Sequence, residues 1–100
     1  MKIIKTKFKN LIIYKKETHK DKRGYFRELY LQKHFKTKFP FDVMSFSKKG
    51  VLRGLHLQTK KTQAKIVTVL KGKIFDVCVD CRKKSMTFGK NFSIILVIMQ

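Results

Sequence analysis

An arginine, a glycine and a histidine lie close together in the segment Arg53-Gly54-Leu55-His56-Leu57-Gln58. A neutral imidazole has a pKa near ~6.5, which suits removal of a proton at neutral pH. A guanidinium binds oxyanions through a planar fork of donors. A histidine among branched apolar residues is more often a satisfied core residue, so this segment indicates catalysis only together with other parts of the chain.

Three further blocks carry residues that could do chemistry. They contain Arg23, Phe26 and Glu28 upstream, Lys65 downstream, and Asp80 with Arg82 further along. Arginine pairs with phosphate oxygens, and an ammonium group stabilises negative charge that develops during a reaction. Each block also has a plain structural explanation: a turn followed by a strand, a surface lysine, and an ion pair.

Strand patterns dominate the elements that must position these residues. Short runs rich in Val, Ile, Leu and Phe predict strands over Leu11 to Tyr14, Phe26 to Leu31, Val43 to Ser47, Val51 to Leu57, Lys65 to Leu70, Ile74 to Cys81 and Phe92 to Ile98. We predict a tight hairpin at Leu70 to Lys73 and one helical turn within Gln32 to Thr37. Many short strands favour a β-sandwich or barrel, so we expect one all-β domain over residues 1–100.

Strand geometry tests whether the histidine segment can form one site. Strict alternation puts Arg53 and His56 on opposite faces, whereas His56 and Gln58 share a face. Both Arg53 and His56 reach one pocket only if a bulge lies between them, and glycine often marks such a bulge. We therefore expect a bulge at Gly54, with His56 in a concave pocket between two sheets near Gln58 and Lys65.

Charge is the unusual part of the composition. The chain has 25 Lys+Arg against 6 Asp+Glu, a formal net charge of +19. This raises the expectation of polyanion binding, but lysines outnumber arginines and are scattered along the chain, which is typical of a solvated surface. We expect no specific nucleic-acid binding. Neither a secretory signal nor an apolar run of the ~20 residues that a membrane span needs is visible, so we expect a cytoplasmic protein without a membrane partner.

The pair Cys78 and Cys81 has the spacing of a redox or zinc motif. On the strand predicted there, residues three apart point to opposite faces, so the two thiols cannot share a metal. We expect no functional cysteine pair.

The order and spacing of these blocks resemble the dTDP-4-dehydrorhamnose 3,5-epimerase family, from about Lys2 to Leu96. The resemblance implies a cupin-like jelly-roll β-sandwich. It also implies roles for individual residues: His56 as the catalytic base, Lys65 beside the developing enolate, Arg53 and Gln58 on the substrate, Arg23, Phe26 and Glu28 on the nucleotide, and Asp80 with Arg82 as a supporting pair.

The implied reaction inverts carbons beside the ketone of a dTDP-4-keto-6-deoxyhexose. A base removes an α-proton, donors stabilise the enolate, and an acid on the other face returns a proton. Metal-binding cupins carry His-x-His where this chain has His56-Leu57-Gln58. We therefore expect no metal and no cofactor.

Two differences from the family shape our expectations. Phe41-Asp42-Val43-Met44 stands where the family carries a Gln-x-Asn element, and the family's tyrosine acid and base-orienting aspartate lie on later strands. We therefore expect a truncated jelly roll without its C-terminal strands, which forms homodimers through its exposed strand edges. Residues 1–100 alone should exchange the α-protons of the substrate slowly, if at all, without completing epimerisation.

Two alternatives remain open at this point. The chain could be a non-catalytic remnant that binds sugar nucleotides or only oligomerises, or a basic polyanion-binding module. Polyanion binding weakens steeply with salt, whereas specific binding of dTDP should persist and depend on Arg23.

Overall fold

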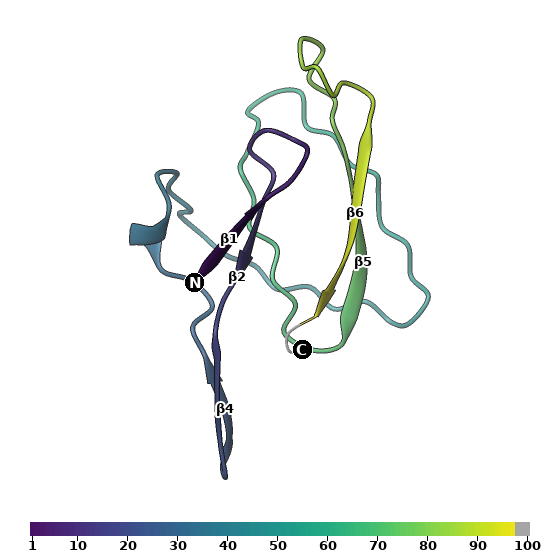
Figure 1. Cartoon of the computed structure of the whole chain (residues 1–100). Helices are drawn as coiled ribbons and strands as arrows, with labels where there is room; N and C mark the ends of the chain where they lie inside the picture. Colours follow the sequence, from purple (N-terminus) through teal and green to yellow (C-terminus); the bar gives the residue numbers. More distant parts are fainter. Residues whose placement is uncertain (98–100) are drawn as a thin grey trace. The chain divides into compact units, whose positions relative to one another are not determined.

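Three antiparallel hairpins contain all the strands in the computed structural model, which describes residues 1–97 (Figure 1). They pair β1 (Lys2–Lys5) with β2 (Ile12–Lys15), β3 (Thr18–Asp21) with β4 (Gly24–Arg27), and β5 (Lys73–Val79) with β6 (Asn91–Val97). Each pair is a two-stranded sheet of its own. A single 3-10 turn, η1 (Gln32–His34), follows the second hairpin. The fold class is therefore all-β, as the sequence predicts.

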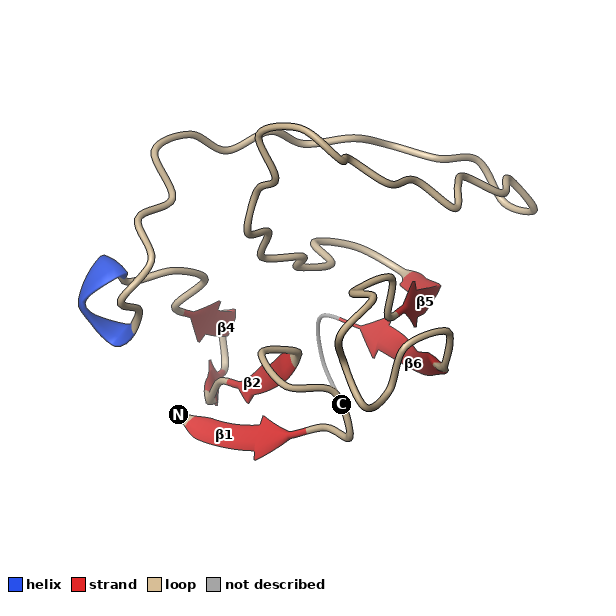
Figure 2. Ribbon diagram, turned by 90° about the horizontal axis from the view of Figure 1, so that it is seen from above, coloured by secondary structure: helices blue, strands red, loops and turns tan. Residues whose placement is uncertain are grey.

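Contacts along the chain define two units. One comprises Met1–Tyr30 and the chain from Thr68 onward, and it holds all three hairpins. The other, Leu31–Val67, contains η1 and is otherwise irregular, as Figure 2 shows by the loop drawn between η1 and β5.

A small apolar core lies in the first unit. Phe8, in the turn between β1 and β2, is only 5% exposed, and its ring meets that of Phe92 on β6 edge-on, with 6.5 Å between the ring centroids. Thr6 fixes the turn, because its hydroxyl donates to the Leu11 carbonyl (2.7 Å) and accepts from the Phe8 N–H (3.1 Å). The turn thus presents Phe8 to the core. Val69 is the other buried apolar residue among those described.

The loop between β5 and β6 is tightly built. Beyond the last strand pair, Val79↔Asn91, the Asp80 N–H donates to the Lys90 carbonyl and the Gly89 N–H donates to the Asp80 carbonyl. Gly89 and Lys90 thus both lie opposite Asp80, which is a β-bulge with glycine at its first position. Gly89 has φ +80°, as the third residue of a type II turn requires, and the Lys90 N–H closes that turn on Thr87. This arrangement holds Asp80 at the base of the loop.

Several sequence predictions are confirmed. The strand predicted over Leu11 to Tyr14 is β2, the one over Ile74 to Cys81 is β5, although it ends at Val79, and the helical turn is η1. The strand predicted over Phe92 to Ile98 is β6, with Ile98 outside the described residues.

Other predictions are wrong. The ranges Val43 to Ser47, Val51 to Leu57 and Lys65 to Leu70 are not strands, and the strand predicted over Phe26 to Leu31 ends at Arg27. Gly72 has the positive φ expected of it, but the segment before it is not a strand, so no hairpin turns there. The reason is pairing: β propensity reflects how well a side chain fits a half-buried sheet surface, and the side chains of Phe46, Leu52 and Leu55 are exposed.

Replacing Phe8 tests the core. Phe8→Ala should lower the free energy of unfolding by about 3 kcal/mol, because it removes a buried ring and leaves a cavity. Phe41→Ala makes the same change where the side chain is 71% exposed and should cost less than about 0.5 kcal/mol. Urea denaturation followed by circular dichroism measures both, and equal effects would contradict this account of the core.

Candidate functional site

The turn of the β3–β4 hairpin is organised by one carboxylate. Asp21 pairs with Gly24 across a two-residue turn, and its Oδ1 accepts the backbone N–H of Arg23 (2.8 Å). Its Oδ2 accepts from Nε (3.2 Å) and Nη2 of the same arginine. Asp21 therefore fixes both the turn and the side chain of Arg23.

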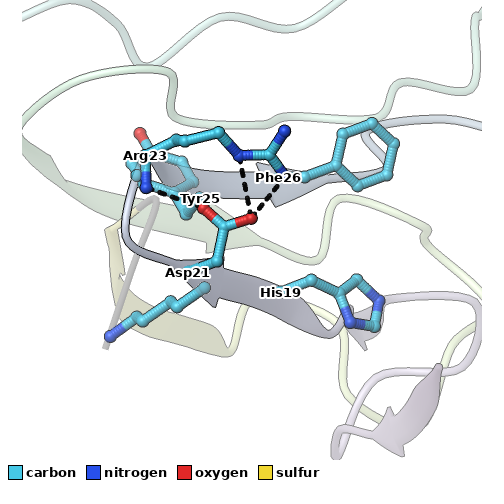
Figure 3. A pocket seen from close by; sticks show the side chains of 7 residues that line it. His19, Asp21, Arg23, Tyr25 and Phe26 are labelled. Carbon is cyan, nitrogen blue, oxygen red and sulfur yellow. Dashed lines mark hydrogen bonds and ion pairs between the residues drawn. The ribbon is translucent and has the colours of Figure 1, made fainter.

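A hollow of about 520 Å³ lies along this hairpin (Figure 3). It is lined by the residues from His19 to Phe26 other than Lys22. His19 and Phe26 are direct cross-strand partners, so alternation places them on the same sheet face as Asp21. The structure thus brings together two of the predicted nucleotide-binding residues, Arg23 and Phe26.

Charge at this hollow is positive and accessible. The hydrogen bonds from Arg23 lower the pKa of Asp21, and the same pairing raises the pKa of Arg23. The Arg23 side chain is nevertheless 90% exposed. An anion can therefore approach a guanidinium that stays charged at every physiological pH.

Glu28, the third predicted nucleotide-binding residue, is separate from this hollow. It follows the end of β4, and its Oε1 accepts from Lys16 Nζ at 3.0 Å. The neighbouring Arg27 donates to the Lys16 carbonyl (2.7 Å). These two contacts join the end of β4 and the residue after it to the chain between β2 and β3.

The histidine segment lies in the second unit and is not a strand. His56, Gln58 and Lys65 are exposed, so the predicted strand face and the pocket between two sheets are wrong for this segment. A strand needs a hydrogen-bonded neighbour, and none of the described residues pairs with Val51 to Leu57.

Local contacts nevertheless shape this segment. The Val51 N–H closes a turn on the Lys48 carbonyl, and Arg53 Nη2 donates to the Phe46 carbonyl at 2.9 Å. Gly54 has φ +101°, and a Cβ there would lie 3.5 Å from Nδ1 of His56. The segment after Arg53 thus folds back on itself, so that His56 lies against the backbone of Gly54.

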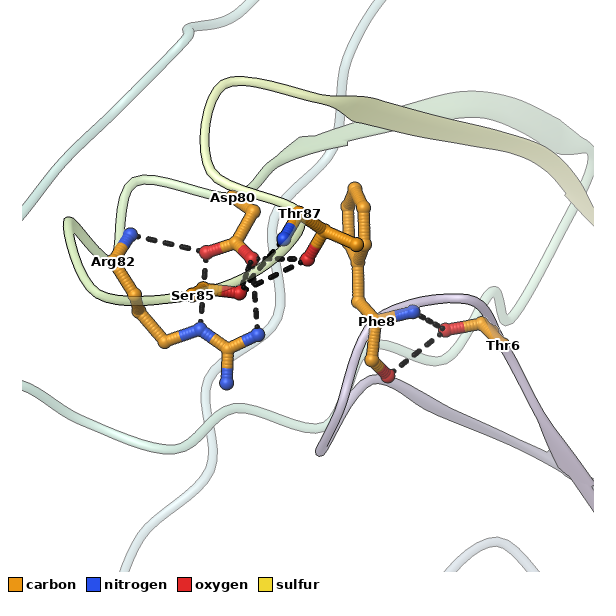
Figure 4. Close-up of polar contacts among 6 residues, drawn as sticks. All are labelled: Thr6, Phe8, Asp80, Arg82, Ser85 and Thr87. Atoms are coloured by element: carbon orange, nitrogen blue, oxygen red, sulfur yellow. Dashed lines mark hydrogen bonds and ion pairs between the residues drawn. The ribbon is translucent and has the colours of Figure 1, made fainter.

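Asp80 forms the most connected polar cluster of the first unit (Figure 4). Its Oδ1 accepts the backbone N–H and Nε of Arg82, both at 3.0 Å, and its Oδ2 accepts from Arg82 Nη2 and from the hydroxyls of Ser85 and Thr87. The carboxylate is 1% exposed. These donors hold the pKa of Asp80 far below its ordinary value, with Arg82 the largest cause. The predicted Asp80–Arg82 ion pair is present.

The two carboxylates use the same local pattern. In Asp21-Lys22-Arg23 and in Asp80-Cys81-Arg82, the aspartate accepts the backbone N–H, Nε and Nη2 of the arginine two residues later. Sequence reasoning missed Asp21 and also His19. The repeated Asp-x-Arg spacing was the available signal for Asp21, and the two-residue spacing from His19 to Asp21 was the signal for a shared strand face.

The cysteines play no paired role in this geometry. Cys78 and Cys81 are both free, and burial, together with the charge of Asp76, raises the pKa of Cys78. Within residues 1–97, no group of three or more His, Cys, Asp or Glu side chains is placed to hold a metal ion. Over the same residues, no helix has the length and apolar character needed to cross a membrane.

Comparison with known proteins places the chain in a family. The family model described as dTDP-4-dehydrorhamnose 3,5-epimerase matches residues 5–99. The chain belongs to the dTDP-4-dehydrorhamnose 3,5-epimerase family. This confirms the resemblance inferred from the Arg-Gly-Leu-His segment and the blocks around it.

Relatives of this epimerase family come from distant organisms. The dTDP-4-dehydrorhamnose 3,5-epimerase of Methanothermobacter thermautotrophicus is 45% identical over 94 residues, which cover 89% of this chain and 51% of the relative. The proteins of that name from Shigella flexneri and Escherichia coli are 44% and 37% identical, over 90% and 96% of this chain and 54% and 56% of their own length. The chain thus spans about half the length of these curated relatives. No solved structure gives a significant match.

Acid sensitivity tests the Asp80 cluster. Because the folded-state pKa of Asp80 lies below the unfolded value, near ~3.9, its stabilising contribution is complete above that value and is lost as the pH falls towards the folded pKa. Urea midpoints of the unmodified chain should therefore fall below about pH 4.

The Asp80→Asn variant should be less stable at pH 7 and show a weaker acid dependence. Asp42→Asn removes the same charge from an exposed residue outside the cluster and is the control. If the urea midpoints of Asp80→Asn and of the unmodified chain change in parallel with pH, the role assigned to the carboxylate is contradicted.

Proposed function

We propose that this chain carries the nucleotide-binding and proton-abstracting residues of an epimerase acting on a dTDP-4-keto-6-deoxyhexose. The observation that carries the proposal is the family match over residues 5–99, which includes His56 and every other residue assigned a role from the sequence. The hollow on the β3–β4 hairpin adds a place where an anionic nucleotide can bind.

Nucleotide binding falls to the β3–β4 hairpin in this proposal. The Arg23 guanidinium pairs with diphosphate oxygens, and the exposed ring of Phe26 stacks on thymine. Glu28, whose Oε1 also accepts from Lys16, accepts a hydrogen bond from the base or a sugar hydroxyl, since a carboxylate has several acceptor sites. A charged fork and an aromatic face on one hairpin suit the two ends of a nucleoside diphosphate.

Proton transfer falls to the segment around His56. Its imidazole removes a proton from a carbon next to the ketone, and the Lys65 ammonium stabilises the enolate as its charge develops. Arg53 and Gln58 contact the sugar and orient it. Asp80 and Arg82 support the loop between β5 and β6 rather than touching substrate. Return of a proton to the opposite face requires an acid that we do not assign within residues 1–97.

We further propose that the three hairpins are parts of a jelly roll completed in a cytoplasmic homodimer. Isolated two-stranded hairpins are marginally stable, and each strand here has one unpaired edge within the described chain. The exposed apolar residues between Phe41 and Leu57 would be buried by such pairing.

Solvent exchange tests the assignment of the base. Incubated in D₂O with dTDP-4-keto-6-deoxyglucose, the chain should incorporate deuterium beside the ketone, slowly, as followed by NMR. His56→Asn should reduce that rate by at least about 100-fold, because asparagine keeps the polar shape but cannot take the proton. His34→Asn makes the same change in η1 and should leave the rate unchanged. Equal rates for the unmodified chain and His56→Asn would overturn the assignment.

Sedimentation equilibrium tests the assembly. The chain of 11.9 kDa should sediment with twice that mass at micromolar concentration. Charged residues placed on the exposed apolar segment, as in Leu52→Glu, should shift the equilibrium towards the monomer, since burial of that segment is what the dimer provides. A single species of 11.9 kDa at all concentrations would exclude the homodimer.

A further inference from the structure

The contacts of Arg23 leave a defined part of its guanidinium unused. Asp21 accepts from Nε and from Nη2, which is one edge of the planar group. Within residues 1–97, Nη1 has no protein partner, and Figure 3 shows this third nitrogen pointing away from Asp21. A guanidinium carries five N–H donors, so Nη1 and the second hydrogen of Nη2 remain for a ligand.

We propose that Asp21 is a positioning residue for anion binding: it holds Arg23 so that the end edge of the guanidinium, Nη1 with Nη2, is presented to a diphosphate beside Phe26. This inference rests on the proposed function, since it concerns the nucleotide that the hairpin binds. Asp21 itself does not touch the ligand and acts through Arg23.

Three observations support this role. Asp21 and Phe26 are on the same sheet face, and both line the hollow that Arg23 also lines. The Arg23 side chain is 90% exposed, so nothing except Asp21 restricts its rotamers among the contacts of the described chain. Ordering a long side chain on binding weakens affinity, and an arginine that is already ordered avoids that loss.

Comparison with Asp80 separates positioning from simple stabilisation. Asp80 makes the same contacts to Arg82, but its carboxylate is 1% exposed and also accepts from Ser85 and Thr87, so the carboxylate is enclosed in its loop while the Arg82 side chain is 47% exposed. Asp21 is 50% exposed and binds only within its own turn. The same pattern is thus used once around a buried carboxylate and once around a half-exposed carboxylate whose arginine is 90% exposed.

An opposing effect sets the conditions of the test. The Asp21 carboxylate also repels a diphosphate, and salt screens this longer-range repulsion more than it screens the Asp21–Arg23 contact, which is at hydrogen-bond distance. Binding should therefore be compared at about 0.05 M and 0.5 M salt. At the higher salt concentration, the positioning effect is measured with little contribution from repulsion.

Calorimetric or NMR titrations with dTDP and with thymidine form the experiment. In 0.5 M salt, Asp21→Asn should weaken dTDP binding about two- to tenfold. The asparagine oxygen can still accept the Arg23 N–H and close the turn, but without the negative charge the side chain no longer holds the guanidinium in place. Thymidine binding should be unchanged, since it depends on Phe26. Glu17→Gln removes one negative charge from the chain just before β3, outside the hollow, and should leave both affinities as they are.

A double-mutant cycle completes the test. In an Arg23→Lys background, Asp21→Asn should have no further effect on dTDP, because an ammonium cannot make the paired Nε and Nη2 contacts. Loss of thymidine binding together with dTDP binding in Asp21→Asn would assign Asp21 to hairpin stability alone and overturn the proposal. Unchanged or tighter dTDP binding at 0.5 M salt would overturn it as well.

Failure of the proposed function gives a different result. If the unmodified chain does not bind dTDP, or binds it equally well after Arg23→Gln, the hairpin is not a nucleotide site and the role of Asp21 falls with it. If Arg23→Gln abolishes binding while Asp21→Asn leaves it intact at 0.5 M salt, the site stands and only the positioning role is wrong.

Discussion

Backbone pairing decides which parts of this chain are ordered as strands. An extended segment must find a partner for its N–H and C=O groups, and each strand here finds it in its nearest neighbour along the chain. The three hairpins therefore depend on their turns. Thr6 fixes the first turn, Asp21 the second, and Asp80 with Gly89 the third. Side-chain and backbone hydrogen bonds at turn positions thus stabilise the three hairpins of the first unit.

The sequence predicted the part of the fold that depends on local pattern. Residues 74–81 and 92–98 are rich in branched residues and are bounded by turn residues, and the structure pairs these two runs as β5 and β6. Strand β1 was missed because lysines begin and end it, and β3 because Thr-His-Lys-Asp has no apolar residue. The strand predicted over Val51 to Leu57 has the right composition but no neighbour in the described chain. Composition identifies a strand that could pair, whereas pairing itself requires a second segment that meets it in register.

The candidate site was predictable to a similar extent. Spacing identified Arg23 and Phe26, and the register of β3 with β4 places them around one hollow. Their neighbour Asp21 was not identified, because its role is visible only in the geometry of the turn. Glu28 was expected beside them, but its contact with Lys16 directs it to the chain before β3. The family match covers both His56 and this hairpin, although the two belong to separate units of the structure. Nucleotide binding and proton abstraction are therefore questions for separate experiments.

The closeness of strand partners along the chain has a kinetic consequence. In β3–β4 the paired residues Asp21 and Gly24 are separated by two residues, and even in β5–β6 the innermost pair, Val79 and Asn91, closes a short loop. Short loops close quickly, and isolated hairpins form in about 1–10 μs. Each hairpin of the first unit can thus form during synthesis as soon as its own second strand has left the ribosome. The turn that holds Arg23 can then form before residues 31–67 have all left the ribosome.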